Sequence, residues 1–308
     1  MTRQVRIHQF GGPEVLKIEE VEVGAPGAGE IRLSIRAIGL NRTEITLRSG
    51  RSPTKPALPS KIGFEAAGMV EAIGPDVTGL AVGDRVALVP AYGAAQYGLY
   101  GEAAIAPARS AVKIPADVRF EDAAATWCAF GTAWGGLVRV GGLKAGQAVV
   151  IPAASSGVGL AAIQIANRIG ASPIALTRTS AKAEALRAHG AATVIATTEQ
   201  DLVAEVKRVT GGAGADLIFD PAGGPTFADL ARATRNGGTL VLYGALSSEP
   251  TVIPPFDIFA RDLTVRGLAL PALTRDDDAL AQMKAFVSAG LADGSRPSRG
   301  SGASRRRS

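Results

Sequence analysis

A run of small residues joins a candidate strand to a candidate helix in the middle of the chain, in "PAASSGVGLAAIQIA" (152–166). At such a turn, small residues let the backbone approach a pyrophosphate, and the helix N-terminus offers unpaired N–H groups. Ala154, Ser156 and Gly159 fill the usual glycine spacing, and Gly157 is added. A loop that serves only packing is the alternative, but the position between strand and helix favours a dinucleotide site. The residues expected to hold the phosphates are Ser155, Ser156, Gly157 and Val158.

The end of the next predicted strand decides which dinucleotide fits. Sites for NAD usually carry Asp or Glu about twenty residues after the turn, for the ribose hydroxyls. This chain instead has "TRTSAK" (177–182), with two cations and three hydroxyls that suit a 2′-phosphate. NADPH is therefore the expected cofactor. The candidate contacts are Thr177, Arg178, Thr179 and Lys182, although Arg178 and Lys182 could simply be the solvated start of a helix.

One carboxylate, Glu65, lies among small and apolar residues in "IGFEAAG" (62–68). A buried unpaired charge is costly, so Glu65 needs a cation, a metal or hydrogen-bond donors as partners. The chain has one cysteine and two histidines, too few for a cysteine-based zinc finger or lobe.

The charge of the chain is concentrated in its last thirteen residues, "RPSRGSGASRRRS", which contain five arginines and no acid. Without them, 33 − 5 = 28 basic residues face 28 acidic ones, so the net charge of +5 belongs to this tail. We expect residues 295–308 to be a disordered basic tail and expect no specific nucleic-acid partner. No apolar run suggests a secretion signal or membrane anchor, so the interpretation is a cytoplasmic protein.

From Ala148 onward, short apolar strands alternate with helical segments, most of which end in glycine. This alternation predicts a parallel sheet covered on both faces, a doubly wound Rossmann domain over residues 123–270. Residues 1–122 instead show short alternating strands between Gly and Pro turns, typical of an antiparallel, barrel-like β domain that would hold the substrate. Residues 271–294 are expected to return to that β domain. The segment "TFADLARATRNGG" (226–238) is interpreted as a helix.

Several segments carry a family resemblance. They are "GLNRTE" (39–44), "PSKIGFEAAGMVEAIG" (59–74), "GDRV" (83–86), "AASSGVG" (153–159), "DPAGG" (220–224) and "YGALS" (243–247). With the order of the two domains, they resemble the zinc-free quinone oxidoreductase branch of the medium-chain dehydrogenase/reductase superfamily. The resemblance covers residues 1 to about 294. It implies a GroES-like first domain, an α/β fold overall and a Rossmann domain that binds NADPH.

The resemblance also bears on zinc. In the zinc alcohol dehydrogenases of this superfamily, Cys stands where this chain has Asn41, His stands at Phe64, and a second Cys matches Cys128. Only the last sulfur remains, whereas catalytic zinc needs three protein ligands. The resemblance therefore implies a zinc-independent enzyme, with Glu65 as a structural carboxylate paired with an Arg or with backbone N–H groups.

The site residues that the resemblance implies are few. Asn41 would lie near the nicotinamide and hydrogen-bond the substrate or cofactor, a turn residue being the alternative. Thr132 matches a cofactor contact at the domain junction, or else caps a helix start. Tyr243 and Ser247 belong to the loop after the fifth strand, as cofactor or packing residues. A tyrosine of many relatives is replaced by Thr46.

Without zinc, a quinone or an α,β-unsaturated carbonyl is the better hydride acceptor, because the negative charge delocalises. We therefore expect an NADPH-dependent oxidoreductase that reduces such an acceptor. An enoyl-thioester reductase and a non-catalytic NADPH-binding protein are the alternatives. Tyr92, Tyr97 and Tyr100 could line the cleft in place of the tyrosine that Thr46 replaces, or equally could stiffen a flexible loop, and solvent is the other source of the proton. A homodimer is expected by analogy alone.

Overall fold

The computed structural model describes residues 1–52 and 55–294. The chain divides into two compact units, whose described parts are residues 1–128 and 129–294. The boundary therefore follows Cys128 instead of residue 122. The tail expected to be disordered, residues 295–308, lies outside the described residues. Within the described ranges, no helix is both long and apolar enough to cross a membrane.

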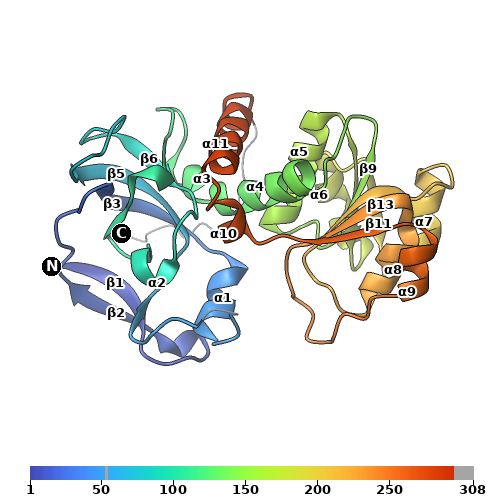
Figure 1. The fold of residues 1–308 in the computed structure, drawn as a ribbon, viewed down its shortest axis with the longest axis horizontal. Coiled ribbons are helices and arrows are strands. Elements are labelled where there is room, and N and C mark those ends of the chain that lie inside the picture. Colours follow the sequence, from blue (N-terminus) through green and yellow to red (C-terminus); the bar gives the residue numbers. More distant parts are fainter. Residues whose placement is uncertain (53–54, 295–308) are drawn as a thin grey trace. The chain divides into compact units, whose positions relative to one another are not determined.

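Two antiparallel sheets form the first unit (Figure 1). The larger has the order β7-β3-β5-β6-β8, and the smaller has the order β2-β1-β4. Alternate residues of β3, Ile31, Leu33 and Ile35, are buried, as a strand with one face on a core requires. This confirms the antiparallel, barrel-like first domain. The strands are β1 (Thr2–Ile7), β2 (Leu16–Val21), β3 (Glu30–Gly39), β4 (Ser60–Lys61), β5 (Glu65–Ile73), β6 (Arg85–Leu88), β7 (Ala103–Pro107) and β8 (Ala111–Lys113).

The helices of the first unit are short: α1 (Arg42–Arg48), α2 (Ala94–Tyr97) and α3 (Phe120–Ala124), with 3-10 turns at Pro13–Val15 and Ala108–Ser110. The register of β3 with β5 matters most for the site. Gly39 at the end of β3 lies opposite Glu65 at the start of β5. A Cβ at position 39 would lie 2.4 Å from the Glu65 Cγ, so only glycine fits there. The pairing thus brings Glu65 beside the residues that begin α1.

A six-stranded parallel sheet of order β11-β10-β9-β12-β13-β14 forms the second unit (Figure 1). From β9 the chain continues to β10 and β11 on one side, and then to β12, β13 and β14 on the other. Ligands of such sheets bind outside the carboxyl ends of the strands at this reversal. The strands are β9 (Ala148–Ile151), β10 (Ser172–Thr177), β11 (Thr193–Ala196), β12 (Ala215–Asp220), β13 (Thr234–Leu242) and β14 (Thr264–Gly267).

The helices of the second unit cover this sheet. α5 packs on β9 and β10, and side chains of α7 and α8 share an apolar core with Val150 and Ile218 of the strands. This confirms the predicted doubly wound fold. The helices are α4 (Trp127–Trp134), whose first two residues belong to the first unit, α5 (Gly157–Ile169), α6 (Ala183–Ala188), α7 (Leu202–Val209), α8 (Thr226–Ala233), α9 (Pro255–Ala260), α10 (Leu270–Leu273) and α11 (Asp277–Ala292), with a π turn at Gly135–Val140 and a 3-10 turn at Ser180–Lys182.

Two segments differ from the prediction. The helix predicted over 226–238 ends at Ala233, and Thr234 already begins β13. Thr234 is buried and pairs with Ala215 of β12, so sheet pairing overrides the helical pattern. Residues 271–294, expected to return to the β domain, belong to the second unit instead. Their helix α11 packs there, with Met283 against Gly131 of α4.

Candidate functional site

The turn between β9 and α5 has the form of a phosphate cradle. Ser156 is the N-cap of α5, and its Oγ accepts the Gly159 N–H at 3.1 Å. Gly157 and Val158 are the first two residues of this 13-residue helix. The N–H groups in the first turn of a helix have no partner within the helix, and the helix dipole makes this end positive. Backbone donors are therefore available for an anion just beyond the carboxyl end of β9.

Close packing at this turn explains its small residues. A Cβ on Gly159 would lie 2.6 Å from the Cα of Ala154, so a side chain there would push the helix away from the strand. Ala153 has φ +48°, in the left-handed region that glycine adopts more readily. The turn therefore keeps the dinucleotide-binding form although alanine and serine replace two glycines.

The loop after β10 reaches the cradle. Lys182 donates from Nζ to the exposed Ser155 Oγ at 3.1 Å, across 27 positions of sequence. Arg178 is exposed, and its main-chain carbonyl accepts hydrogen bonds from the Thr198 N–H at 3.0 Å and the Thr198 Oγ1 at 2.6 Å. Thr177 ends β10, and Thr179 is the residue before the 3-10 turn that contains Lys182. The structure thus brings Lys182 of this loop to the turn between β9 and α5.

Sequence reasoning missed Glu199, which also reaches this loop. Its Oε1 accepts the Ser180 N–H at 3.0 Å. Because Glu199 follows the third strand of the unit, no local motif points to it. Its charge opposes a phosphate, so Arg178 and Lys182 must also offset this carboxylate.

Tyr243 directly follows β13 and is half-buried. Its ring stacks on Phe219, with ring centroids 4.0 Å apart. Burial raises the pKa of Tyr243, and its Oη is buried without a hydrogen-bond partner among residues 1–52 and 55–294. The ring thus packs on Phe219, while its Oη stays without a partner among the described residues.

Ser247 lies farther along the same loop. Its N–H donates to the Ala222 carbonyl at 3.1 Å, and its Oγ accepts the Glu249 N–H at 3.0 Å. A Cβ on Gly224 would lie 2.2 Å from the same Oγ. Ser247 thus closes the loop against the "DPAGG" turn, so its hydroxyl is already engaged before a cofactor binds.

Thr132 is buried inside α4, at the sixth of its eight positions. It therefore does not cap the start of this helix, as one interpretation of the sequence had it.

In the first unit, Asn41 lies between two buried carboxyl groups. Glu44 accepts the main-chain N–H of Asn41 at 2.6 Å and the Phe64 N–H at 3.2 Å. Glu65 accepts the Asn41 Nδ2 at 3.0 Å and the Cys128 N–H at 2.7 Å. Asn41 is also the N-cap of α1, three residues before Glu44. The expected partners of Glu65 are thus found among backbone N–H groups and an amide, and not at an arginine.

Both carboxyl groups are almost inaccessible, with Glu44 3% and Glu65 2% exposed. Burial raises the pKa of Glu65 to about 8 and the pKa of Glu44 to about 7, because desolvation disfavours the charged forms. The negative charge of Glu44 contributes to the rise at Glu65, while the hydrogen bonds from the backbone oppose it. The cluster therefore holds at least part of a proton at neutral pH.

The three candidate tyrosines lie in the same unit. Tyr92 donates its hydroxyl to the Phe64 carbonyl at 2.7 Å, and Tyr97 donates to Glu30 Oε1 at 2.7 Å. The bond to Glu30 raises the pKa of Tyr97 to about 12, and burial raises the pKa of both Tyr92 and Tyr100. Each hydroxyl is thereby held in its protonated form, which makes these tyrosines weak acids.

The donor set around Asn41 does not fit a tetrahedral zinc. No group of three or more His, Cys, Asp or Glu side chains that could hold a metal occurs among the described residues. Asn41 offers an amide and Phe64 a hydrocarbon, while burial raises the pKa of the Cys128 thiol and so disfavours the thiolate that binds zinc. The Glu65 oxygens are already hydrogen-bonded.

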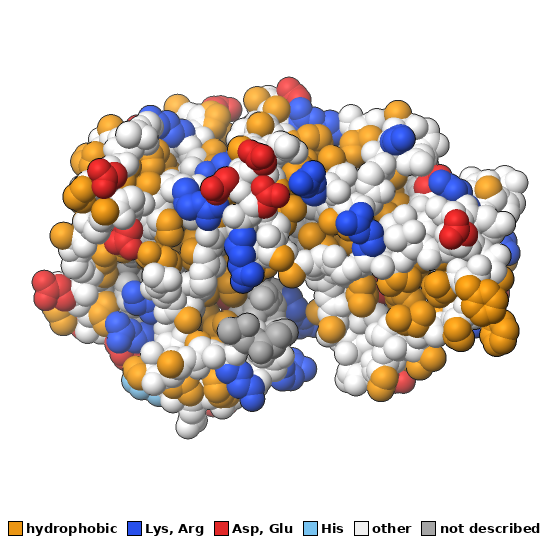
Figure 2. Space-filling model, viewed as in Figure 1, with side chains coloured by type: hydrophobic (Ala, Val, Ile, Leu, Met, Phe, Trp, Pro, Cys, Tyr) orange, Lys and Arg blue, Asp and Glu red, His pale blue; other side chains and the backbone are white. Residues whose placement is uncertain are grey.

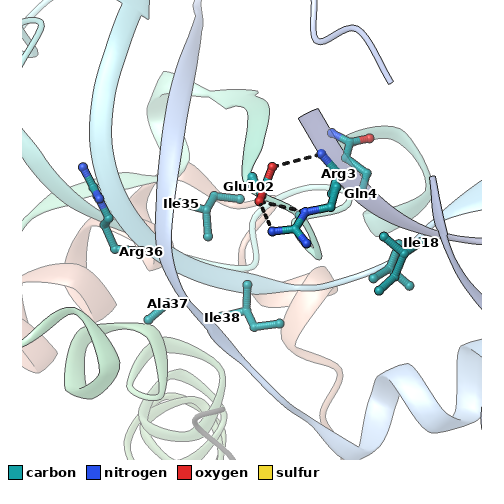
Figure 3. A pocket seen from close by; sticks show the side chains of 10 residues that line it. Arg3, Gln4, Ile18, Ile35, Arg36, Ala37, Ile38 and Glu102 are labelled. Carbon is teal, nitrogen blue, oxygen red and sulfur yellow. Dashed lines mark hydrogen bonds and ion pairs between the residues drawn. The ribbon is translucent and has the colours of Figure 1, made fainter. Parts of the chain in front are cut away.

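A pocket of about 230 Å³ elsewhere in the first unit has a different character (Figure 3). It is lined by Arg3, Ile18, Ile35, Ile38 and Glu102, among others. The Arg3 guanidinium binds Glu102 Oε1 at 2.6 Å, so the two charged groups satisfy each other. The pocket contains none of the predicted site residues.

Family comparisons agree with this geometry. The "Zinc-binding dehydrogenase" family matches residues 157–288, and the "Alcohol dehydrogenase GroES-like domain" family matches residues 27–116. A GroES-like unit followed by a phosphate cradle at the reversal of a parallel sheet defines an oxidoreductase that uses a nicotinamide dinucleotide.

Individual relatives show which branch of this family the chain resembles. The quinone oxidoreductase of Lama guanicoe is 30% identical over 292 residues, covering 94% of this chain and 86% of that protein. A 2-haloacrylate reductase of a Burkholderia species is 35% identical over 275 residues, covering 87% and 80%. The solved quinone oxidoreductase of Escherichia coli complexed with NADPH has a TM-score of 0.85 at 30% identity, covering 95% and 88%. The chain belongs to the medium-chain dehydrogenase/reductase superfamily, in its quinone oxidoreductase branch, as its motifs suggested.

Proposed function

We propose that this protein is an NADPH-dependent reductase that acts without zinc and transfers hydride to a quinone or an α,β-unsaturated carbonyl. The observation that carries the cofactor assignment is the contact of Lys182 with Ser155. It brings a cation from the second β/α loop to the edge of the phosphate cradle, where a 2′-phosphate would need it. Arg178, exposed in the same loop, adds a second cation.

The proposed cofactor contacts are all in the second unit. The N–H groups of Gly157 and Val158 would hold the pyrophosphate, with Ser155 beside them. Thr177, Arg178, Thr179 and Lys182 would surround the 2′-phosphate, and Thr132, Tyr243, Ser247 and Ser156 would complete the site. NADPH would supply the hydride, and the protein would orient it and exclude competing reactions.

The nature of the acceptor follows from the donor set. Asn41 and Phe64 supply no metal ligand of the kind that zinc prefers, so no Lewis acid is proposed to polarise an alcohol or a simple ketone. A quinone or an activated alkene needs less polarisation by a Lewis acid, because the negative charge that hydride adds to it delocalises. We propose that Asn41 donates a hydrogen bond to the acceptor carbonyl. The similar quinone oxidoreductase and 2-haloacrylate reductase are named for these two classes of acceptor, which supports the proposal.

Cofactor binding is measured first, and turnover of acceptors is measured second. NADPH and NADH are titrated into the wild type, Arg178→Ala and Lys182→Ala, with Arg187→Ala in the last turn of α6 as a matched control. Loss of either loop cation should raise the Kd for NADPH roughly tenfold or more, since charge-assisted hydrogen bonds contribute about 1.5–3 kcal/mol. The Kd for NADH and the control should change little. Equal affinity for both nucleotides in the wild type would contradict the cofactor assignment.

An acceptor panel then separates the candidate activities. Oxidation of NADPH is followed with duroquinone, 2-cyclohexen-1-one, a crotonyl thioester and cyclohexanone, each with and without EDTA. Turnover of the first two, unaffected by EDTA, is expected. Activity confined to the thioester would favour an enoyl-thioester reductase. NADPH binding without turnover of any acceptor would favour a non-catalytic protein.

We also propose a homodimer formed through the β14 edge of the sheet. Among the described strands β14 pairs only with β13, and all four of its residues are exposed. Phe256 and Phe259 of α9 are 77% and 67% exposed. Hydrophobic side chains gather on this part of the second unit, at the right of Figure 2. An open strand edge beside apolar surface is typical of an association site.

A further inference from the structure

Glu65 is fixed at both of its oxygens. Oε1 accepts the Asn41 Nδ2 at 3.0 Å, and Oε2 accepts the Cys128 N–H at 2.7 Å. The residue is 2% exposed and begins β5 opposite Gly39. Its carboxyl group therefore has one orientation, set by the main chain at Cys128. The hydrogen bond between Glu65 Oε1 and Asn41 Nδ2 then fixes the orientation of the Asn41 carboxamide.

No cation explains why a carboxyl group is buried here. Among the ranges that the structure describes, neither Glu44 nor Glu65 forms an ion pair with Lys or Arg. Burying carboxyl groups without such a partner costs free energy, and apolar residues of similar volume often serve a core at least as well. If Glu65 had only a structural role, an apolar residue at this position would thus stabilise the fold at least as well.

Asn41 is also held from its main chain. Glu44 accepts the main-chain N–H of Asn41 at 2.6 Å, while Glu65 takes one N–H of the side chain. A carboxamide carries two N–H donors on its nitrogen. One of them is bound to Glu65, and the Asn41 side chain also interacts with the Glu44 carboxyl group. Rotation of the amide is therefore restricted, and its second N–H has a defined direction.

We infer that Glu65 is a positioning residue, which fixes the Asn41 carboxamide so that its second N–H meets the carbonyl of the hydride acceptor. This inference rests on the proposed function, in which Asn41 hydrogen-bonds that carbonyl. Glu65 itself touches neither acceptor nor cofactor, and its effect on the rate passes through Asn41.

Glu65→Gln is the sharpest perturbation. Above about pH 8, where Glu65 is ionised, its carboxylate accepts a hydrogen bond at each oxygen, whereas a glutamine of the same shape has one acceptor and one NH₂ donor. The NH₂ must then face the N–H of either Asn41 or Cys128. The variant keeps volume and removes acceptor capacity. Glu71→Gln, on the outer part of the same strand, is the control.

A double-mutant cycle gives the first test. With duroquinone as acceptor at about pH 9, where Glu65 is ionised, Glu65→Gln and Asn41→Ala should each lower kcat/KM roughly 10- to 100-fold, the scale of a small misplacement in a site. The double variant should lose no more than Asn41→Ala alone, and Kd for NADPH should stay within about twofold. If Glu65→Gln lowered kcat/KM by the same factor in the wild type and in Asn41→Ala, Glu65 would have a structural role that does not pass through Asn41. That result would overturn the inference.

A second measurement does not depend on activity. The chain has three asparagines, Asn41, Asn167 and Asn236, so selective ¹⁵N-asparagine labelling gives three side-chain amide pairs. Asn41→Ala identifies the pair of interest. In the wild type this pair should be well dispersed and slow to exchange with water, and Glu65→Gln should remove both properties while Glu71→Gln does not.

The two measurements separate the two proposals. An inactive wild type with an ordered, Glu65-dependent Asn41 amide would defeat the proposed function while leaving Glu65 as the residue that orients Asn41. A wild-type Asn41 amide that exchanges freely and ignores Glu65→Gln would overturn the positioning role, whatever the activity.

Discussion

Raising the pH should destabilise this protein well before any lysine or tyrosine titrates, because of the carboxyl cluster in the first unit. Burial raises the pKa of Glu65 to about 8 and that of Glu44 to about 7, against 4.5 for a free glutamate. The folded state therefore binds these protons more tightly than the unfolded state. The resulting stability is fully present below about pH 4.5 and is lost as the pH rises through 7 and 8.

The magnitude follows from linkage. One carboxyl group that is protonated when folded and ionised when unfolded costs about 1.4 kcal/mol of unfolding free energy for each pH unit. Between pH 5.5 and 7.5 Glu65 alone should account for at most roughly 3 kcal/mol, and relaxation of the interior reduces this. Glu65→Gln cannot ionise, so its free energy of unfolding should depend less steeply on pH.

Urea unfolding at several pH values between 5.5 and 8.5 provides the assay. Trp127 is fully buried next to Cys128, and the chain has only two tryptophans, so fluorescence in a Trp134→Phe background reports on the first unit. The comparison is the slope of unfolding free energy against pH for this background, with Glu65→Gln and with the control Glu71→Gln. Parallel slopes for all three proteins would refute the reasoning, since Glu65 would then be ionised throughout.

Three further results are expected from the second unit. Gly159→Ala should weaken NADPH binding at least tenfold and lower the urea midpoint, because the new Cβ would lie 2.6 Å from the Ala154 Cα; unchanged binding would mean that α5 moves freely. Ser156→Ala removes the N-cap of α5 and should cost about 1 kcal/mol of unfolding free energy, and a loss below about 0.3 kcal/mol would contradict the capping role. Replacing both Phe256 and Phe259 by Ser should convert a dimer into monomers in light scattering after size exclusion, whereas a dimer that persists would place the interface elsewhere.

Local pattern was enough for much of the fold. The alternation of buried Ile31 and Leu33 marks a strand with one solvated face, and the run from Ala148 to Ala166 marks a strand, a turn and a helix. Both signals depend on neighbours in sequence. Prediction failed at Thr234, where the helical pattern continued but pairing of β13 with β12 decided the structure.

Contacts between distant residues could not be predicted in the same way. The sequence identified Lys182 as a candidate, yet its bond to Ser155 depends on how β10 lies beside β9. Glu199 contacts the same loop through the Ser180 N–H, and no local sequence motif indicated this contact. Such groups are brought together by the order of strands in a sheet, which local sequence patterns do not encode.

The sequence by itself determined the two-domain α/β class, the family and the type of cofactor site, because glycine spacing and strand-helix alternation are short-range properties. Only the tertiary structure decided what Glu65 contacts. Its partners, Asn41 and Cys128, lie 24 and 63 residues away, and the register of β3 with β5 brings the first of them to it. The high pKa of Glu65 has the same origin, since desolvation depends on everything packed around a group and not on its neighbours in the chain.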